Sequence, residues 1–117
     1  MTTPLQEPTF LILAALAEQP LHGYGVIQEV SALSDGRVTL RPGTLYGALD
    51  RLVEQGLVAP DREEIVDGRL RRYYRLSDDG ARVLEAEAAR LSSNATVAVS
   101  RLRRREKGAE RPGLSHA

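Results

Sequence analysis

Apolar residues recur every three or four positions in three segments of the first half of the chain, residues 8–18, 21–33 and 43–55. This spacing places them along one face of a helix, so the pattern predicts three short amphipathic helices. In the third segment the inward stripe consists of Leu45, Leu49, Leu52 and Val53. The residues left facing outward are Thr44, Tyr46, Gly47, Asp50 and Arg51.

The ends of the third helix are marked by proline and glycine. Pro42 disfavours helical angles at Arg41, and we expect Gly43 or Thr44 then to cap the helix. Gly56 is placed to end it in a left-handed conformation.

Two strand-like segments follow, residues 57–65 and 69–76, and the Asp67-Gly68 pair between them is a strong hairpin signal. Side chains alternate between the two faces of a strand, so the returning strand has two different faces. One face, expected to be mostly core, carries Leu70, Arg72, Tyr74 and Leu76. The other face, expected to be a basic exposed ribbon, carries Arg69, Arg71, Tyr73 and Arg75.

A long helix is predicted to begin after the hairpin, with the Ser77 hydroxyl as its cap. Its apolar positions alternate steps of four and three, which is the spacing of a helix that packs against another helix. This seam consists of Leu84, Ala88, Leu91, Ala95, Ala98 and Leu102. We expect a domain over residues 8–76, a dimerisation helix over 77–107 and a disordered tail over 108–117. The predicted fold is mainly α-helical with a small antiparallel β-hairpin, a winged helix-turn-helix followed by a long C-terminal helix.

Composition narrows the function. The chain has 117 residues, enough for one domain, and it has no cysteine, so thiolate metal sites and disulfides are excluded. It contains no nucleophile motif and no phosphate-binding loop, so we expect neither an enzyme nor a bound cofactor or metal. The apolar run near the N-terminus is too short for a membrane span and has no basic flank, so a cytoplasmic location is expected.

The formal net charge is zero, with 16 basic and 16 acidic residues, which counts against indiscriminate coating of nucleic acid. The local distribution is uneven, because residues 69–75 contain four arginines and no acid. A second basic cluster, Arg101 to Lys107, is either a solvated helix end or an accessory DNA arm.

Several motifs occur in a fixed order along residues 10–91. They are LHGYG at residues 21–25, PGTLY at 42–46, GLV at 56–58 and DGRLRRYYRL at 67–76. Together they resemble the PadR family of bacterial transcriptional regulators, and the single helix after the wing resembles its shorter branch. The resemblance implies a winged-helix domain, a C-terminal dimerisation helix, and a homodimer that represses by occupying a palindromic double-stranded DNA operator.

The resemblance also assigns roles to residues. Thr44 and Tyr46 would lie at the start of the recognition helix, and the arginines of the returning strand would belong to the wing. The full set of expected DNA-contacting residues is Arg41, Gly43, Thr44, Tyr46, Arg51, Arg69, Arg71, Arg72 and Tyr73. Asp50 and Glu54 leave Arg51 as the only cation on the recognition helix, so we expect affinity to come largely from the wing and Arg41.

Other roles for these residues stay open. Tyr46 could instead pack where the recognition helix meets the wing, and the wing arginines could be an ordinary solvated face. Tyr24 is expected to be a packing residue with its hydroxyl near DNA, and His22 a helix-start or surface polar residue.

The rival function is a winged helix that binds protein without specific DNA binding. Family members also suggest a small-molecule effector at the dimer interface, although this chain has no tryptophan to line such a pocket.

Overall fold

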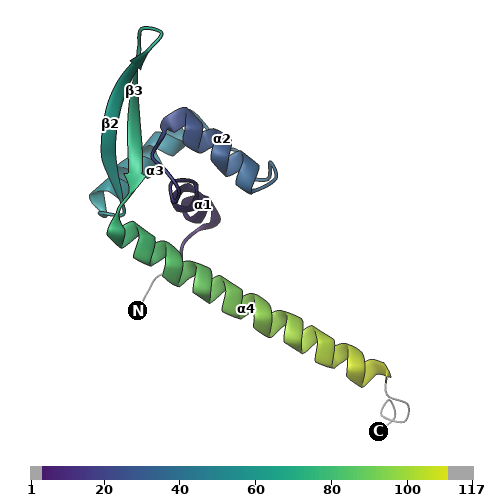
Figure 1. Ribbon diagram of the computed structural model, residues 1–117. Helices are drawn as coiled ribbons and strands as arrows, with labels where there is room; N and C mark the ends of the chain where they lie inside the picture. The colour runs from purple at the N-terminus through teal and green to yellow at the C-terminus, as the bar shows by residue number, and fades with distance from the viewer. Residues whose placement is uncertain (1–3, 111–117) are drawn as a thin grey trace. The chain divides into compact units, whose positions relative to one another are not determined.

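The computed structural model describes residues 4–110, and its elements follow the predicted order (Figure 1). They are α1 (Glu7–Ala15), β1 (Leu21–His22), α2 (Gly23–Leu33), α3 (Pro42–Glu54), β2 (Val58–Val66), β3 (Arg69–Leu76) and α4 (Asp78–Glu110). The predicted fold class is confirmed: the chain is mainly helical, with a small antiparallel sheet and a long C-terminal helix. Within the described residues, 4–87 form one compact unit and 88–110 form a second.

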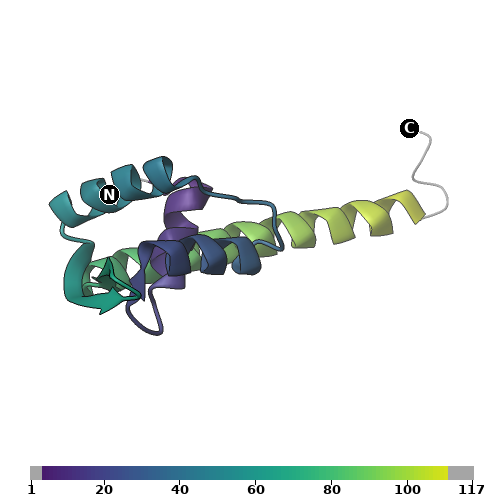
Figure 2. The ribbon, with the colours of Figure 1, turned by 90° about the horizontal axis from the view of Figure 1, so that it is seen from above.

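The core of the first unit lies among α1, α2 and α3. Helix α1 is seen end-on in Figure 1 and runs across α2 in Figure 2. The helices contribute the largest fully buried apolar side chains, including Ile12, Leu13, Val26, Val30, Leu45 and Leu49. The predicted inward stripe of α3 is therefore confirmed at Leu45 and Leu49.

The predicted cap of α3 is wrong, although its end is confirmed. Arg41 is the N-cap, with extended backbone and no side-chain capping bond, and Pro42 is the first helical residue. Proline suits that position because its φ is already helical and its missing N–H would have had no partner there. At the other end Gly56 has φ +76°, the left-handed conformation predicted for it.

A three-stranded antiparallel sheet has the order β1-β3-β2. The hairpin turn is confirmed, because Asp67 and Gly68 both have positive φ, +52° and +76°. Strand β1 was not predicted, since two residues are too few to show alternation; it places His22 opposite Tyr73. A register shift between Pro60 and Glu63 interrupts the pairing of β2 with β3.

The core-facing side of β3 is shorter than predicted. Tyr74 is buried and Leu76 is half-buried, as expected, but Leu70 and Arg72 on the same face are exposed. Figure 1 shows the cause, because the outer part of the hairpin extends beyond the helices and meets no packing partner there.

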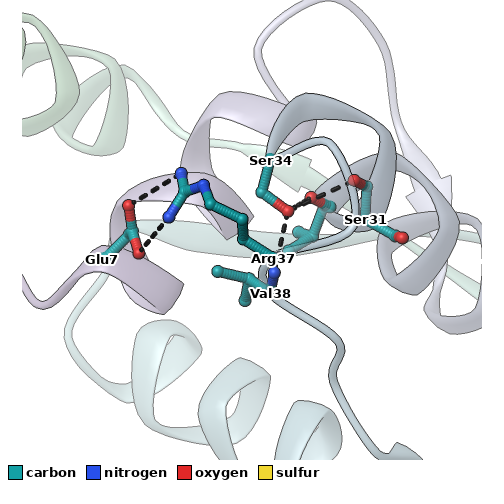
Figure 3. Close-up of polar contacts among 6 residues, drawn as sticks. Glu7, Ser31, Ser34, Arg37 and Val38 are labelled. Carbon is teal, nitrogen blue, oxygen red and sulfur yellow. Dashed lines mark hydrogen bonds and ion pairs between the residues drawn. The ribbon is translucent and has the colours of Figure 1, made fainter.

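The loop between α2 and α3 is fixed by local polar contacts (Figure 3). Ser34 Oγ donates to the Val30 carbonyl at 2.9 Å and accepts from the Val38 N–H at 3.0 Å. The Arg37 guanidinium makes two contacts with the Glu7 carboxylate, at 3.2 and 3.3 Å, and so ties the loop to the start of α1.

The start of α4 is joined to the end of α3. Ser77 Oγ accepts from the Gly80 N–H at 2.9 Å, which confirms the predicted cap, and donates to the Gly56 carbonyl at 2.6 Å. About two turns after Gly80, the buried Glu87 accepts a hydrogen bond from the Leu5 N–H at 2.9 Å, a contact with no signal in the sequence. Helix α4 continues to Glu110, beyond the expected end at Lys107, and the rest of the expected tail, residues 111–117, lies outside the described residues.

Candidate nucleic-acid interface

A hollow of about 710 Å³ opens among the start of α2, the first turns of α3 and strand β3. It brings together Tyr46 and three wing arginines, which are more than twenty positions apart in the sequence. The residues that line it are His22, Gly23, Tyr24, Tyr46, Arg69, Leu70, Arg71 and Arg72. The hollow therefore combines aromatic side chains with a concentration of positive charge.

Tyr46 stands over the first residue of α2. A Cβ placed on Gly23 would overlap the Tyr46 hydroxyl and its ring carbons, so glycine is what allows the tyrosine to lie there. The Tyr46 side chain nevertheless keeps 45% of its surface exposed. Tyr46 therefore combines features of its two predicted roles, because it packs against the start of α2 and part of its side chain remains exposed.

The prediction that Tyr24 is a packing residue is wrong. It is 63% exposed and does not belong to the buried core. Its ring lines the same hollow as Tyr46. The sequence pattern did not separate these possibilities, since a tyrosine at the start of a helix suits either position.

The start of α3 presents Arg41, Gly43 and Thr44 to solvent, as predicted, and Arg51 is exposed two turns further on. None of the four lines the hollow. The expected DNA-contacting residues therefore fall into two neighbouring groups, one along α3 and one in the hollow.

Acids on β2 pair with some of the hairpin arginines. Arg62 contacts Glu64 at 2.8 Å, Arg75 contacts Asp61 at 3.8 Å, and Arg72 contacts Glu63 at 3.9 Å. Within residues 4–110, Arg69 and Arg71 make no ion pair, and both are exposed. Positive charge that is not neutralised within the hairpin is thus concentrated at these two residues.

Tyr73 organises the base of the wing. The Arg62 guanidinium lies 3.9 Å from the centre of its ring, and its hydroxyl donates to Glu64 at 3.1 Å. The hydrogen bond from Arg62, and then that from Tyr73, hold the pKa of the Glu64 carboxyl below its usual range. The predicted exposure of this face is therefore wrong at Tyr73, which is half-buried by these contacts, whereas Arg69, Arg71 and Arg75 on the same face are exposed.

His22 is the helix-start residue that the sequence suggested. Its Nδ1 accepts a hydrogen bond from the Gly25 N–H at 3.3 Å, and its ring meets Tyr73 edge-on at 5.3 Å. Burial lowers the pKa of His22, the Arg71 charge lowers it further, and the Glu64 carboxylate opposes both. The neutral imidazole is the form that can accept this capping bond.

The described residues contain no cluster of acidic, histidine or cysteine side chains that could hold a metal ion. No helix in residues 4–110 is long and apolar enough to cross a membrane.

Comparison with known proteins identifies the family to which this chain belongs. Residues 12–86 match the Transcriptional regulator PadR-like family. The transcriptional regulator Rv3488 of Mycobacterium tuberculosis is 40% identical over 73 residues, which are 62% of this chain and 64% of that protein. An uncharacterised 37.1 kDa protein in transposon TN4556 of Streptomyces fradiae is 46% identical over 85 residues, 70% of this chain. The match spans only 23% of that protein, so less than two thirds of either relative is covered.

Solved structures share the fold. A PadR family transcriptional regulator from Eggerthella lenta superposes with a TM-score of 0.64 at 31% identity, over 80% of each chain. Bacillus subtilis PadR, solved in complex with operator DNA, has a TM-score of 0.63 at 21% identity, over 72% of this chain and 47% of that one. The family is one of transcriptional regulators and not of enzymes. The family match spans residues 12–86, which are well over half of this chain. This chain therefore belongs to the PadR-like family of transcriptional regulators.

Proposed function

We propose that this protein is a sequence-specific DNA-binding regulator that acts as a homodimeric repressor on a palindromic operator. The observation that carries the proposal is the hollow in which the unpaired Arg69 and Arg71 adjoin the exposed rings of Tyr24 and Tyr46. Arginine is suited to bidentate contacts with phosphate, and exposed arginines without acidic partners bind a polyanion at little cost.

The proposed docking places α3 in the major groove, which is wide enough to admit a helix. Thr44 and Tyr46 would then reach base edges, Arg41 and Gly43 the backbone at the helix start, and Arg51 a phosphate further along. The hairpin would bring Arg69, Arg71 and Arg72 to the flanking phosphates, with Tyr73 supporting it from behind. A purely protein-binding module would favour apolar residues on the outward face of α3, whereas this face carries Thr44, Asp50 and Arg51.

The proposed dimer uses the second unit. Its large apolar side chains are exposed in the single chain, with Leu91 at 41% and Leu102 at 56%. A second copy of the helix would cover the seam residues Ala88, Leu91, Ala95, Ala98 and Leu102, whose alanines permit close approach. Leu84, the first residue of the predicted seam, lies in the first unit and packs in part against the core of that unit. Residues 8–76 would be the DNA-binding domain and 77–107 the dimerisation helix, and the two recognition helices would read half-sites about 34 Å apart.

The test of DNA binding is a titration of labelled duplex at several salt concentrations, after selection of bound sequences. Affinity should fall as salt rises, because phosphate contacts release counterions, and Arg71→Ala should reduce the slope of log affinity against log salt by about one. The matched control is Arg37→Ala, since Arg37 is exposed but paired with Glu7 and does not line the hollow. Affinity that is independent of salt would refute the proposal.

Repression is tested separately. A reporter gene placed behind the selected operator should be expressed less when the protein is present, and Arg71→Ala should restore expression. Increased expression in the presence of the protein would identify an activator instead.

We also propose a site for a small-molecule effector, based on a cavity of about 380 Å³ between α3 and the hairpin. Its volume falls at the lower end of the range of known ligand pockets. Val53, Pro60 and the buried Tyr74 supply apolar surface, and the two arginines in the lining face acids with which they pair. Of the three carboxylates that line the cavity, Asp61 and Glu63 are paired with arginines and Asp50 makes no ion pair in the described part of the chain, so the cavity suits a small aromatic cation.

Such a ligand would act where the recognition helix meets the wing, and would change how the two engage DNA. The probe is 2-phenylethylamine, compared with the neutral 2-phenylethanol by nuclear magnetic resonance titration. The amine should shift the signals of Asp50 and Val53 and bind about tenfold more tightly, and Asp50→Asn should remove the difference. Glu54→Gln, on the same helix but outside the cavity, should leave it unchanged; equal binding of amine and alcohol would refute this site.

A further inference from the structure

The two units differ in charge, although the chain as a whole is neutral. Residues 4–87 contain nine basic and fourteen acidic residues and so have a net charge of −5. Residues 88–110 contain six basic and two acidic residues and so have a net charge of +4. The helix dipole accounts for little of this positive charge, because its effect falls off within the last turn, where Lys107 is the basic residue. The other cations of the second unit need a different explanation.

A groove of about 690 Å³ lies along one face of α4 within the second unit. Its polar lining combines hydroxyl groups with cations and consists of Ser92, Thr96, Ser100, Arg103, Arg104 and Lys107. Arg104 Nη2 donates to Ser100 Oγ at 3.2 Å, which holds one guanidinium beside the hydroxyls. Within residues 4–110 none of the three cations makes an ion pair, and the neighbouring Glu106 does not line the groove. The groove therefore carries positive charge that the described chain does not neutralise.

The heptad of the seam places these cations on the outside of the proposed dimer. When the alternation of four and three is continued past Leu102, Arg103, Arg104 and Lys107 fall at the three positions farthest from the seam. Ala95 is the seam residue that also lines the groove. A second copy packed against the seam would therefore leave the three cations exposed.

The lining of the groove indicates what it binds. Arginine, lysine and serine or threonine hydroxyls are the side chains that commonly contact DNA phosphates. The apolar part of the lining is only Ala95 and Val99. A helix that lies in a membrane surface buries larger apolar side chains, and protein interfaces are centred on aromatic, methionine and other large apolar residues. The chemistry of the groove thus favours a phosphate backbone over a membrane or an acidic protein.

We infer that this groove binds the phosphate backbone of a second segment of duplex DNA, separate from the half-site proposed for the first unit. Arg103 and Lys107 lie about 24 and 30 Å along α4 from Glu87, the last residue of the first unit. Three cations give a log-log salt slope of about −2.7 for each copy, so the contact is weak at physiological salt. It becomes effective when a dimer already held at its operator meets a second segment at high effective concentration.

The inference rests on the proposed function only because the operator holds the first duplex. The experiment saturates the protein with an unlabelled operator duplex and titrates the complex with a labelled duplex of unrelated sequence at several salt concentrations. The wild-type complex should bind the second duplex with a slope of about −2.7. Arg103→Ala and Lys107→Ala should each reduce that slope by about 0.9 and weaken this binding several-fold, with the affinity for the operator unchanged. The matched control is Arg101→Ala, an exposed cation of the same helix that does not line the groove, and it should bind both duplexes as the wild type does.

Two results of this titration would overturn the inference. One is a wild-type complex that binds no second duplex, including one that only binds a longer operator duplex more tightly. The other is a loss for Arg101→Ala equal to that for Lys107→Ala. Binding of phosphatidylglycerol vesicles or polyglutamate in preference to the duplex would also overturn it, by identifying a membrane or an acidic protein as the partner.

Failure of the proposed function is distinguishable from failure of the inference. If selection finds no operator, the proposed function fails, and the free protein is then titrated with the unrelated duplex. Weaker binding by Lys107→Ala but not by Arg101→Ala would uphold the inference in that case, and equal binding by the two variants would overturn it.

Discussion

Gly80 provides a quantitative test of how the first unit holds the start of α4. A Cβ at this position would overlap the Leu57 carbonyl oxygen and lie 2.7 Å from Leu76 Cδ1 and 3.0 Å from the Leu57 carbonyl carbon. The obstacle is backbone, which cannot rotate away as the end of a side chain can. The same carbonyl accepts the Ser77 N–H at 3.1 Å, so displacing it also weakens a hydrogen bond. Gly80→Ala should therefore separate the start of α4 from the end of α3.

The net effect combines opposing contributions. Overpacking against a fixed group costs about 1 to 3 kcal/mol, and a weakened backbone hydrogen bond about 1 kcal/mol more. Alanine in a helix gains about 1 kcal/mol over glycine. We expect Gly80→Ala to lower the free energy of unfolding by about 2 kcal/mol. If helix propensity alone decided the outcome, the same substitution would raise the free energy of unfolding.

The measurement is urea denaturation followed by circular dichroism, at one protein concentration because dimerisation would add to the stability. Gly47→Ala is the matched control, since that helical glycine would place its Cβ 3.6 Å from Arg51 Nη1, an ordinary contact. The control should gain about 0.5 to 1 kcal/mol. If Gly80→Ala gained as much as the control, the close approach of α4 to Leu57 would be wrong.

Three further perturbations address the proposed interface, the cap of α2 and the proposed dimer. Gly23→Ala should displace the Tyr46 ring and reduce the preference for operator over random DNA several-fold, with little change in stability; an equal loss on both DNAs would contradict a base-proximal Tyr46. The lowered pKa of His22 contributes stability that is complete above about pH 6.5 and is lost as pH falls through the folded value, because the unfolded state takes up the proton first. Urea unfolding between pH 7.5 and 5 should show this loss, and His22→Asn, which retains a capping side chain, should show less of it. Leu91→Asp should lower the sedimenting mass to that of a monomer, whereas Val97→Asp, outside the seam, should not.

Local signals account for what was predicted correctly. The Asp67-Gly68 turn, the left-handed Gly56 and the Ser77 cap each depend on the conformational preferences of a few neighbouring residues. Features set by distant contacts were missed. Strand β1 exists because β3 passes beside residues 21 and 22. Leu70 is exposed because the hairpin extends beyond the helices. A periodic pattern of apolar residues carries no information about either contact.

The same distinction applies to the interface. The arginines of β3 were identifiable from their number, but which of them stay unpaired depends on the register that places Glu63 opposite Arg72 and Glu64 opposite Arg71. Glu64 is drawn to Arg62 and Tyr73 and makes no ion pair with Arg71. The proximity of Gly23 to Tyr46 arises only in the folded chain, so the glycine has no signal of its own in the sequence.

The pairing of charges also bears on why a regulator of zero net charge would work as a dimer. Along α3 and β3 the arginines without an ion pair in the described chain are Arg41, Arg51, Arg69 and Arg71. If each neutralises one phosphate, a single copy has a log-log salt slope of about −4 and a dimer about −7. A single copy would therefore bind weakly at physiological salt, whereas in the proposed dimer the second half-site would be engaged at a high effective concentration. Because the acids of β2 limit the charge of each copy, we expect affinity for arbitrary DNA to stay low and tight binding to require both half-sites of the proposed operator.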